Sequence, residues 1–367
     1  MIEVADVLRQ YGPAYLQQFG DKIPASHRRA FEDILRCRTA ALGGHLYECN
    51  ECGRQHYSYH SCRNRSCPKC HAGDTQAWLQ QRQAELLPVP YYHVIFTIPQ
   101  ELRGVTRRHQ KPLYALLMQS AAHAILKLAA DPHYVGGLIG VMAVLHTWGS
   151  NLAYHPHVHC LATGAGVSAD GQQWRPARDD YLVPVKALSK LFRGMLLDRI
   201  RRQFPEIQLP SSLWQKDWVV HCKPAVQGTE KVLEYLGRYI HRVAITNSRI
   251  LSIEDGKVTF RYRDSRTAQA KTMTLDANEF IRRFLQHVLP SGFHKVRYYG
   301  LWSPSHRDHL HTWQDRLVKP SADEQPPSRL DPAVEISSPP QPRRCPYCKT
   351  GTLIWIRRLP AQGRAPP

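Results

Sequence analysis

The sequence lacks an apolar run long enough to cross a bilayer, and it lacks a recognisable secretory leader. The longest apolar run, GGLIGVMAVLH at residues 136–146, falls well short of the about 20 residues that a membrane-spanning helix needs. The first residues, MIEVADVLRQYG, have neither the basic start nor the apolar core of a leader. We therefore expect a soluble cytoplasmic protein whose cysteines stay reduced.

Acidic residues are also scarce: 30 Asp and Glu stand against 49 Lys and Arg, giving a formal net charge of +19. Such a charge attracts polyanions with strongly salt-dependent affinity, so nucleic acid is the first partner to consider. Basic ribosomal and membrane-surface proteins share this charge, which therefore does not decide among them. The chain shows no phosphate-cradling loop and no helicase motor, so a host helicase would have to supply any unwinding.

The expected strands and helices follow one another without regular alternation. Strands are predicted at residues 91–99, on both sides of a turn near 149–151, at 295–300 and as a hairpin over 257–275; helices are predicted at 109–131, 191–204, 229–245 and 278–290. This order favours an α+β fold with a central antiparallel sheet, flanked by helices, over a doubly wound parallel sheet.

A cysteine-rich unit lies near the N-terminus. Two Cys-x-x-Cys knuckles, Cys49 with Cys52 and Cys67 with Cys70, flank a β-prone spacer. Each knuckle directs two thiolates at one ion, so the four together predict a closed structural zinc site in a fold like a zinc ribbon. Two unrelated pairs of buried cysteines are the alternative.

Other residues could replace one of these ligands or hold a second ion: Cys37, Cys62, His45, His60 and His71. A third knuckle, Cys345 with Cys348, follows a segment rich in proline and serine near the C-terminus. It supplies only two thiolates, so a zinc site there needs ligands from elsewhere, such as Cys37, Cys62 or a second chain. A thioredoxin-like redox motif is the alternative, but its strand and helix context is missing.

The segment YHPHVHC places His155, His157 and His159 at every second position. In a strand, alternate side chains share one face, and Pro156 cannot donate to the ladder, so pairing begins near His157. His157 and His159 then form a pair that suits a metal ion.

In the predicted helix at 229–245, Tyr235, Tyr239 and Arg242 fall along one edge beside the apolar stripe. On the helix alone we favour packing for the tyrosines. Together with the histidine pair, however, they supply the needs of phosphodiester transfer to a tyrosine: a hydroxyl nucleophile, a cation and positive charge.

At this point the chain resembles the rolling-circle transposases of insertion sequences, the IS91 family within the HUH (His-hydrophobic-His) endonucleases. The resemblance is carried by several blocks in one order, among them SCRNRSCPKC, HVIFTIP, LHTWGSNLAYHPHVHC, YLGRYIHRVAI and FIRRFLQHVLPSGFHKVRYYG. It implies a zinc-binding, DNA-binding domain at residues 1–90 and a catalytic domain at 91–302. Beyond them, composition alone predicts a proline-rich linker with a Cys-x-x-Cys tail at 303–367.

The resemblance also implies roles for single residues. His157 and His159 match the histidines that hold magnesium or manganese, and Tyr235 and Tyr239 match the tyrosines that form a 5′-phosphotyrosine. A third metal ligand is expected, with His146 as the first candidate and His155 and Asn151 behind it. Basic residues expected to contact DNA lie in the zinc unit, on the tyrosine helix and on the 257–275 hairpin: Arg63, Arg65, Lys69, Arg238, Arg242, Arg261 and Arg263. For any single one of them, a solvated basic surface is the alternative.

The expected function is therefore that of a DNA transposase acting on single-stranded DNA at element ends and on target DNA, associated with the bacterial nucleoid when bound. A plasmid replication initiator or relaxase would use the same chemistry, and a non-catalytic zinc-dependent DNA-binding protein would need only the charge and the cysteines. A zinc nucleobase deaminase requires His-x-Glu ahead of Pro-Cys-x-x-Cys, which the chain does not supply.

Overall fold

The computed structural model describes residues 1–70, 86–178, 181–226, 237, 242–264, 267–317 and 343–362. No helix in these ranges is both long enough and apolar enough to cross a membrane.

A six-stranded antiparallel sheet forms the centre of the molecule, with the order β11-β4-β5-β3-β7 and with β6 paired to β5. Its strands are β3 (Tyr91–Thr97), β4 (Leu138–Trp148), β5 (Tyr154–Val167), β6 (Trp174–Pro176), β7 (Val220–Val226) and β11 (Val296–Gly300). Strand β4 and most of β5 are almost continuously buried, because both faces of the sheet are covered there.

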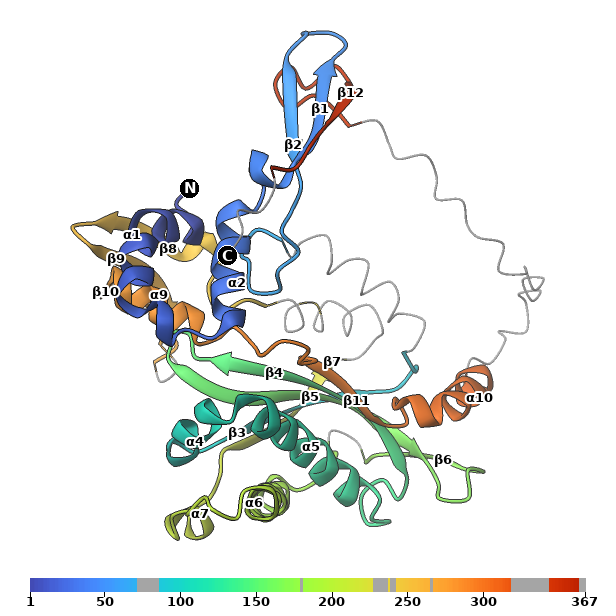
Figure 1. Cartoon of the computed structure of the whole chain (residues 1–367). Coiled ribbons are helices and arrows are strands. Elements are labelled where there is room, and N and C mark those ends of the chain that lie inside the picture. Colours follow the sequence, from blue (N-terminus) through green and yellow to red (C-terminus); the bar gives the residue numbers. More distant parts are fainter. Residues whose placement is uncertain are drawn as a thin grey trace, which may run out of the picture.

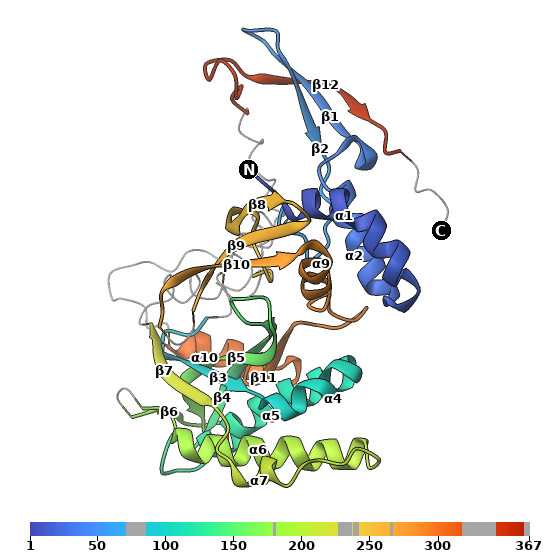
Figure 2. The same cartoon turned by 90° about the vertical axis from the view of Figure 1, so that its left-hand side faces the viewer.

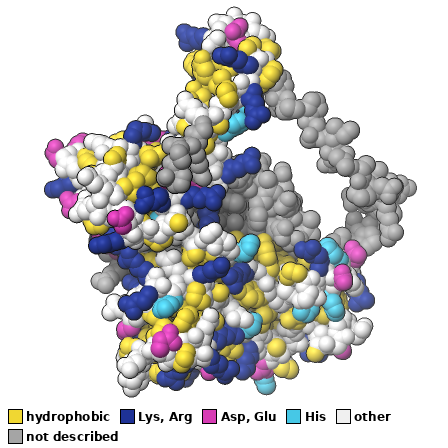
Figure 3. Space-filling model, in the orientation of Figure 1, with side chains coloured by type: hydrophobic (Ala, Val, Ile, Leu, Met, Phe, Trp, Pro, Cys, Tyr) yellow, Lys and Arg dark blue, Asp and Glu magenta, His cyan; other side chains and the backbone are white. Residues whose placement is uncertain are grey.

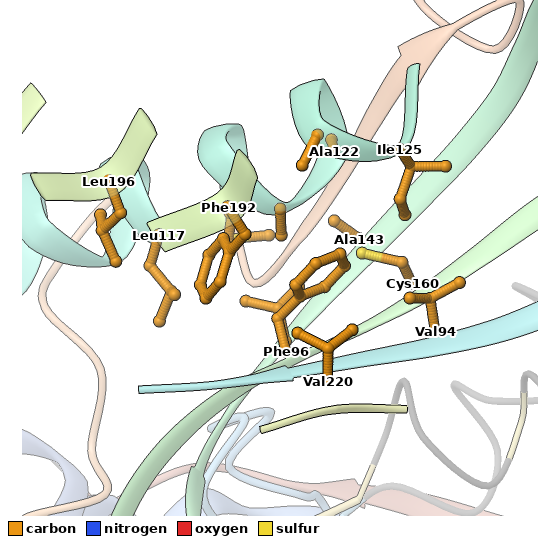
Figure 4. Packing of buried hydrophobic residues seen from close by; sticks show 14 of the residues in the cluster. Val94, Phe96, Leu117, Ala122, Ile125, Ala143, Cys160, Phe192, Leu196 and Val220 are labelled. Atoms are coloured by element: carbon orange, nitrogen blue, oxygen red, sulfur yellow. The ribbon is translucent and has the colours of Figure 1, made fainter. Parts of the chain in front are cut away.

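Helices cover one face of this sheet (Figure 1). They are α4 (Arg103–Arg108), α5 (Gln110–Ala129), α6 (Val185–Gln203) and α7 (Ser212–Gln215). Phe96 of β3 meets Phe192 of α6 with ring centroids 4.8 Å apart, and Val94 and Cys160 lie beside them in the same buried cluster (Figure 4). Burial of each such phenylalanine contributes about 1.5–3 kcal/mol, so this layer fixes which face of β5 points away from the helices.

The other side of the sheet carries a second layer built from both halves of the chain (Figure 2). It contains α1 (Val4–Phe19), α2 (Ala25–Arg36), α9 (Ala277–Leu285) and a three-stranded sheet of β8 (Ile250–Glu254), β9 (Lys257–Arg263) and β10 (Ala270–Asp276). Val7 and Phe31 share a buried core with Phe260 and Phe280. This core crosses the boundary expected at residue 90, so the N-terminal helices pack as part of the same layer as residues 244–288.

A third sheet stands out from the body (Figures 1 and 2). It has the order β12-β1-β2, with β1 (Gly44–Cys49), β2 (Gln55–Tyr59) and β12 (Leu353–Leu359). The segment expected to be a linker and tail makes two contacts with the rest of the chain. Helix α10 (Arg307–Leu317) packs Leu310 and Trp313 onto Leu301, and β12 pairs with β1 near the other end of the sequence.

Short 3-10 turns complete the described elements, at Gly20–Lys22, Ala40–Leu42, Gln100–Leu102, Asn247–Arg249 and Pro304–His306. The α+β fold with a central antiparallel sheet is confirmed. The strands on both sides of the turn near 149–151 are present as β4 and β5, and the 257–275 hairpin is present as β9 and β10.

The turn between β4 and β5 is held from the second layer. Leu152 is buried and adopts a positive φ of 61° in this turn. Its carbonyl accepts hydrogen bonds from Gln286 Nε2 at 3.0 Å and from His287 Nε2 at 3.1 Å, just beyond α9. The Thr147 hydroxyl donates to the other ring nitrogen, His287 Nδ1, at 3.2 Å. These bonds fix the two strands relative to each other.

Burial lowers the pKa of His287 to about 3, so the imidazole is neutral in the folded protein. The unfolded chain takes up a proton near pH 6.5, so stability is lost as the pH falls below that value. Between pH 7 and pH 5, we expect the free energy of unfolding, measured in urea, to fall by roughly 2 kcal/mol more in the wild type than in His287→Gln. The exposed His133→Gln serves as control. Equal losses in all three proteins would contradict this role of His287.

Candidate metal centres

Three histidines converge on the sheet face opposite α5 and α6. The β4–β5 register sets His146 across from His157, and His159 follows on the same face one rung along. The ligand nitrogens of the three side chains all lie within 4.8 Å of one another. Side chains alternate along β5, so Val158 and Cys160 enter the core beneath while the imidazoles face the other way.

Hydrogen bonds orient two of these rings. His157 Nδ1 lies 2.7 Å from the backbone carbonyl of His155; a carbonyl only accepts, so Nδ1 carries the proton and Nε2 keeps its lone pair. His159 Nδ1 lies 2.8 Å from His93 Nε2, so His93 orients the His159 ring through that nitrogen. Such bonds to the second ring nitrogen are typical of metal-binding histidines.

The protein environment keeps these rings neutral, as metal ligation requires. Burial lowers the pKa of His157 to about 4. Burial, followed by the neighbouring His157 and His93, holds the pKa of His159 well below its ordinary value. Arg242 and Lys295 act on His159 in the same direction, so positive charge lies close to the cluster.

The sequence did not reveal His93. In YYHVIFT it is a single histidine within a strand, and only the pairing of β3 with β5, with Ile95 opposite His159, brings its ring to the cluster. The alternative third ligands have other hydrogen-bond partners: His155 Nδ1 is 2.8 Å from Arg103 Nη2, and Asn151 Oδ1 accepts from the Ala153 amide within the turn.

The basic residues named from the sequence differ in their surroundings. Arg65 donates to the carbonyls of Leu289, Pro290 and Phe293, and Lys69 forms an ion pair with Glu3, so both tie parts of the chain together.

The remaining described basic candidates are exposed: Arg63, Arg242, Arg261 and Arg263. Tyr235, Tyr239, Arg238 and His71 lie outside the described residues.

The cysteines form two separate clusters. Cys37, Cys62, Cys67 and Cys70 meet where α2 ends and the loop after β2 returns. The Sγ atoms of Cys37 and Cys62 lie 3.3 Å and 3.4 Å from Cys70 Sγ. Hydrogen bonds from neighbouring thiols, first from Cys62, lower the pKa of Cys37, so this thiol is the first of the four to ionise.

The second cluster joins Cys49 and Cys52 with Cys345 and Cys348. This corrects the expectation of one site made by Cys49, Cys52, Cys67 and Cys70. The two N-terminal knuckles lie at opposite ends of the β1–β2 hairpin, and a five-residue strand such as β2 spans roughly 16 Å. One ion cannot bridge that length, so each knuckle takes its partners from elsewhere in the chain.

Two family models match this chain. Residues 7–98 match a family described as a transposase zinc-binding domain, and residues 140–309 match a family described as a putative transposase. The putative transposase y4qJ of Sinorhizobium fredii is 41% identical over 377 residues, covering 96% of this chain and 94% of that protein.

The transposase for insertion sequence element IS801 of Pseudomonas savastanoi pv. phaseolicola is 29% identical over 283 residues, covering 73% of this chain and 68% of that protein. No solved structure matches significantly.

If the three imidazoles form one site, then His146→Ala, His157→Ala and His159→Ala should each weaken manganese binding at least about tenfold, measured by calorimetry. His155→Ala is the matched control, because it leaves the carbonyl that orients His157 in place. Weakening by His155→Ala equal to that by His146→Ala would argue against His146 as the third ligand.

Proposed function

Because this chain belongs to the insertion-sequence transposases that carry a transposase zinc-binding domain, we propose that it nicks and rejoins single-stranded DNA in rolling-circle transposition, with a tyrosine as the nucleophile. The observation that carries the proposal is the cluster of three histidines on one face of the central sheet, in which His157 and His159 are oriented by hydrogen bonds and kept neutral by burial. Three imidazoles leave positions open around a cation, which a phosphate oxygen requires.

In this scheme the phenolic oxygen of Tyr235 or Tyr239 attacks the scissile phosphorus. The bond from phosphorus to the 3′ oxygen breaks, the DNA strand remains joined to tyrosine through a 5′-phosphate, and the 3′ oxygen leaves as a hydroxyl after gaining a proton. A divalent cation held by His146, His157 and His159 supplies charge that polarises the phosphate. With two tyrosines, one can hold the first cleaved end while the other attacks a second strand.

Exposed basic and aromatic side chains support binding of a single strand. On the third sheet and its C-terminal knuckle, Tyr57, Tyr347 and Trp355 are each about half exposed, and the Arg54 guanidinium lies 5.4 Å from the centre of the Tyr347 ring. Bases stack on such rings regardless of sequence, while arginines contact phosphates. Lys and Arg side chains are spread over the visible face of the body (Figure 3).

The two tyrosines provide the test. Purified protein is incubated with labelled single-stranded oligonucleotides from the element's ends, with and without manganese, and adducts are resolved on a denaturing gel and mapped to peptides. We expect a metal-dependent adduct on Tyr235 or Tyr239 that disappears in the double phenylalanine variant, because phenylalanine lacks the attacking oxygen. DNA binding should be retained.

Tyr181→Phe, at an exposed position, is the matched control and should leave the adduct unchanged. Adducts that persist in the double variant would remove these tyrosines from the mechanism. Tight DNA binding without any adduct in the wild type would instead favour a non-catalytic zinc-dependent DNA-binding protein. Use of the same chemistry on a plasmid origin rather than on element ends would favour a replication initiator or relaxase.

A further inference from the structure

The knuckle near the C-terminus lies against the tip of the N-terminal hairpin. Cys49 Sγ is 3.6 Å from Cys348 Sγ, and Cys52 Sγ is 3.7 Å from Cys345 Sγ. We propose that these four cysteines hold a second zinc ion, so that the last part of the chain completes a zinc ribbon begun by β1 and β2. The matched zinc-binding family spans residues 7–98 and therefore does not include Cys345 or Cys348.

The distances suit zinc and exclude disulfides. Four thiolates at Zn–S bonds of about 2.3 Å lie about 3.8 Å apart at the corners of a tetrahedron. A disulfide would bring two sulfurs to about 2.05 Å, and every cysteine in the chain is free.

Ligand counting leads to the same assignment. The six cysteines before residue 98 are Cys37, Cys49, Cys52, Cys62, Cys67 and Cys70. Four of them already form the first cluster at the end of α2, which leaves the hairpin tip with two thiolates. A closed structural site needs four ligands, and the C-terminal knuckle supplies the missing pair.

Backbone geometry around the second cluster is that of two opposed knuckles. The amides of Tyr347 and Gly351 donate to the sulfurs of Cys345 and Cys348 at 3.4 Å and 3.3 Å. Hydrogen bonds from backbone amides favour thiolates, the form that binds metal. Gly351 fits closely: a Cβ there would lie 2.5 Å from Cys49 Sγ, so the two knuckles approach only because this position has no side chain.

Contacts beside the cysteines hold the tail in register. Strand β12 runs antiparallel to β1, with Cys49 opposite Leu353. Asn50 and Thr352 exchange hydrogen bonds, since the Thr352 amide donates to Asn50 Oδ1 at 2.8 Å and the Asn50 amide donates to the Thr352 carbonyl at 3.2 Å. The Thr350 hydroxyl donates to Glu51 at 2.6 Å. A two-stranded hairpin is marginal by itself, so β12 and the shared ion stabilise the ribbon together.

Zinc content measures the proposal directly. We use the full chain carrying His157→Ala and His159→Ala, so that zinc on the histidine cluster is not counted. This protein should hold two zinc ions by mass spectrometry. Adding Cys345→Ser with Cys348→Ser should leave one, adding Cys49→Ser with Cys52→Ser should leave one, and adding all four should still leave one because they share an ion.

Cys222→Ser, outside both clusters, is the control for loss of a thiol and should keep both ions. Two ions retained after replacement of Cys345 and Cys348 would overturn the proposal. The zinc count does not depend on DNA cleavage, so this experiment tests the second zinc site independently of the proposed function.

An experiment on the native cysteines covers the case in which a variant fails to fold. A protease site is inserted between residues 318 and 342 of the full chain, and the protein is cut there. The C-terminal fragment should remain bound through gel filtration and should leave when a chelator removes zinc, at which point Cys49, Cys52, Cys345 and Cys348 become alkylated together. A fragment that separates while zinc is still bound at Cys49 and Cys52 would show that the tail is not a ligand.

Discussion

The register between β4 and β5 is the constraint on which the candidate active site depends. Because side chains alternate, one register places Val158 and Cys160 in the core beneath α5 and α6 and directs His157 and His159 to the opposite face. A slip by one residue would exchange these sets, placing the imidazoles in the apolar core and the apolar residues at the candidate site. The same hydrophobic packing that stabilises the sheet therefore brings the three histidines together. The register that it fixes also places His146 opposite His157, so no further interaction is needed to position His146.

The second layer holds this arrangement from the other side. Gln286 and His287 bond to the carbonyl of Leu152 in the β4–β5 turn, and α9, which precedes them, shares its core with the N-terminal helices. Arg65, in the loop of the first cysteine cluster, donates to the carbonyls of Leu289 and Phe293 ahead of β11. The loop of the first cysteine cluster is thus bonded to the segments that flank the central sheet, so it helps to fix the candidate site.

Local sequence patterns were enough to predict many of the strands and helices. They were not enough to predict which distant segments pair with one another. Alternation alone indicated that His157 and His159 share a face, because both lie in one strand. Partners brought from other strands or from the far end of the chain left no such signal: His93 reaches His159 only through the β3–β5 register, and Cys49 meets Cys348 only because β12 returns to β1. Cysteine spacing identifies a knuckle but does not say which second knuckle it faces.

The two kinds of cluster differ in chemistry in a way that matches different tasks. Four thiolates are soft ligands that enclose zinc and leave no position for a substrate, so the cysteine clusters are suited to stabilising the fold. Three imidazoles leave coordination positions open, as contact with a phosphate requires. Among the residues that the structure describes, this cluster consists of imidazoles alone; because imidazole suits the later transition metals and magnesium prefers oxygen ligands, a cation held by these three side chains would be manganese rather than magnesium. In the proposed reaction, the type of ligand, rather than the fold, would then determine which cation binds.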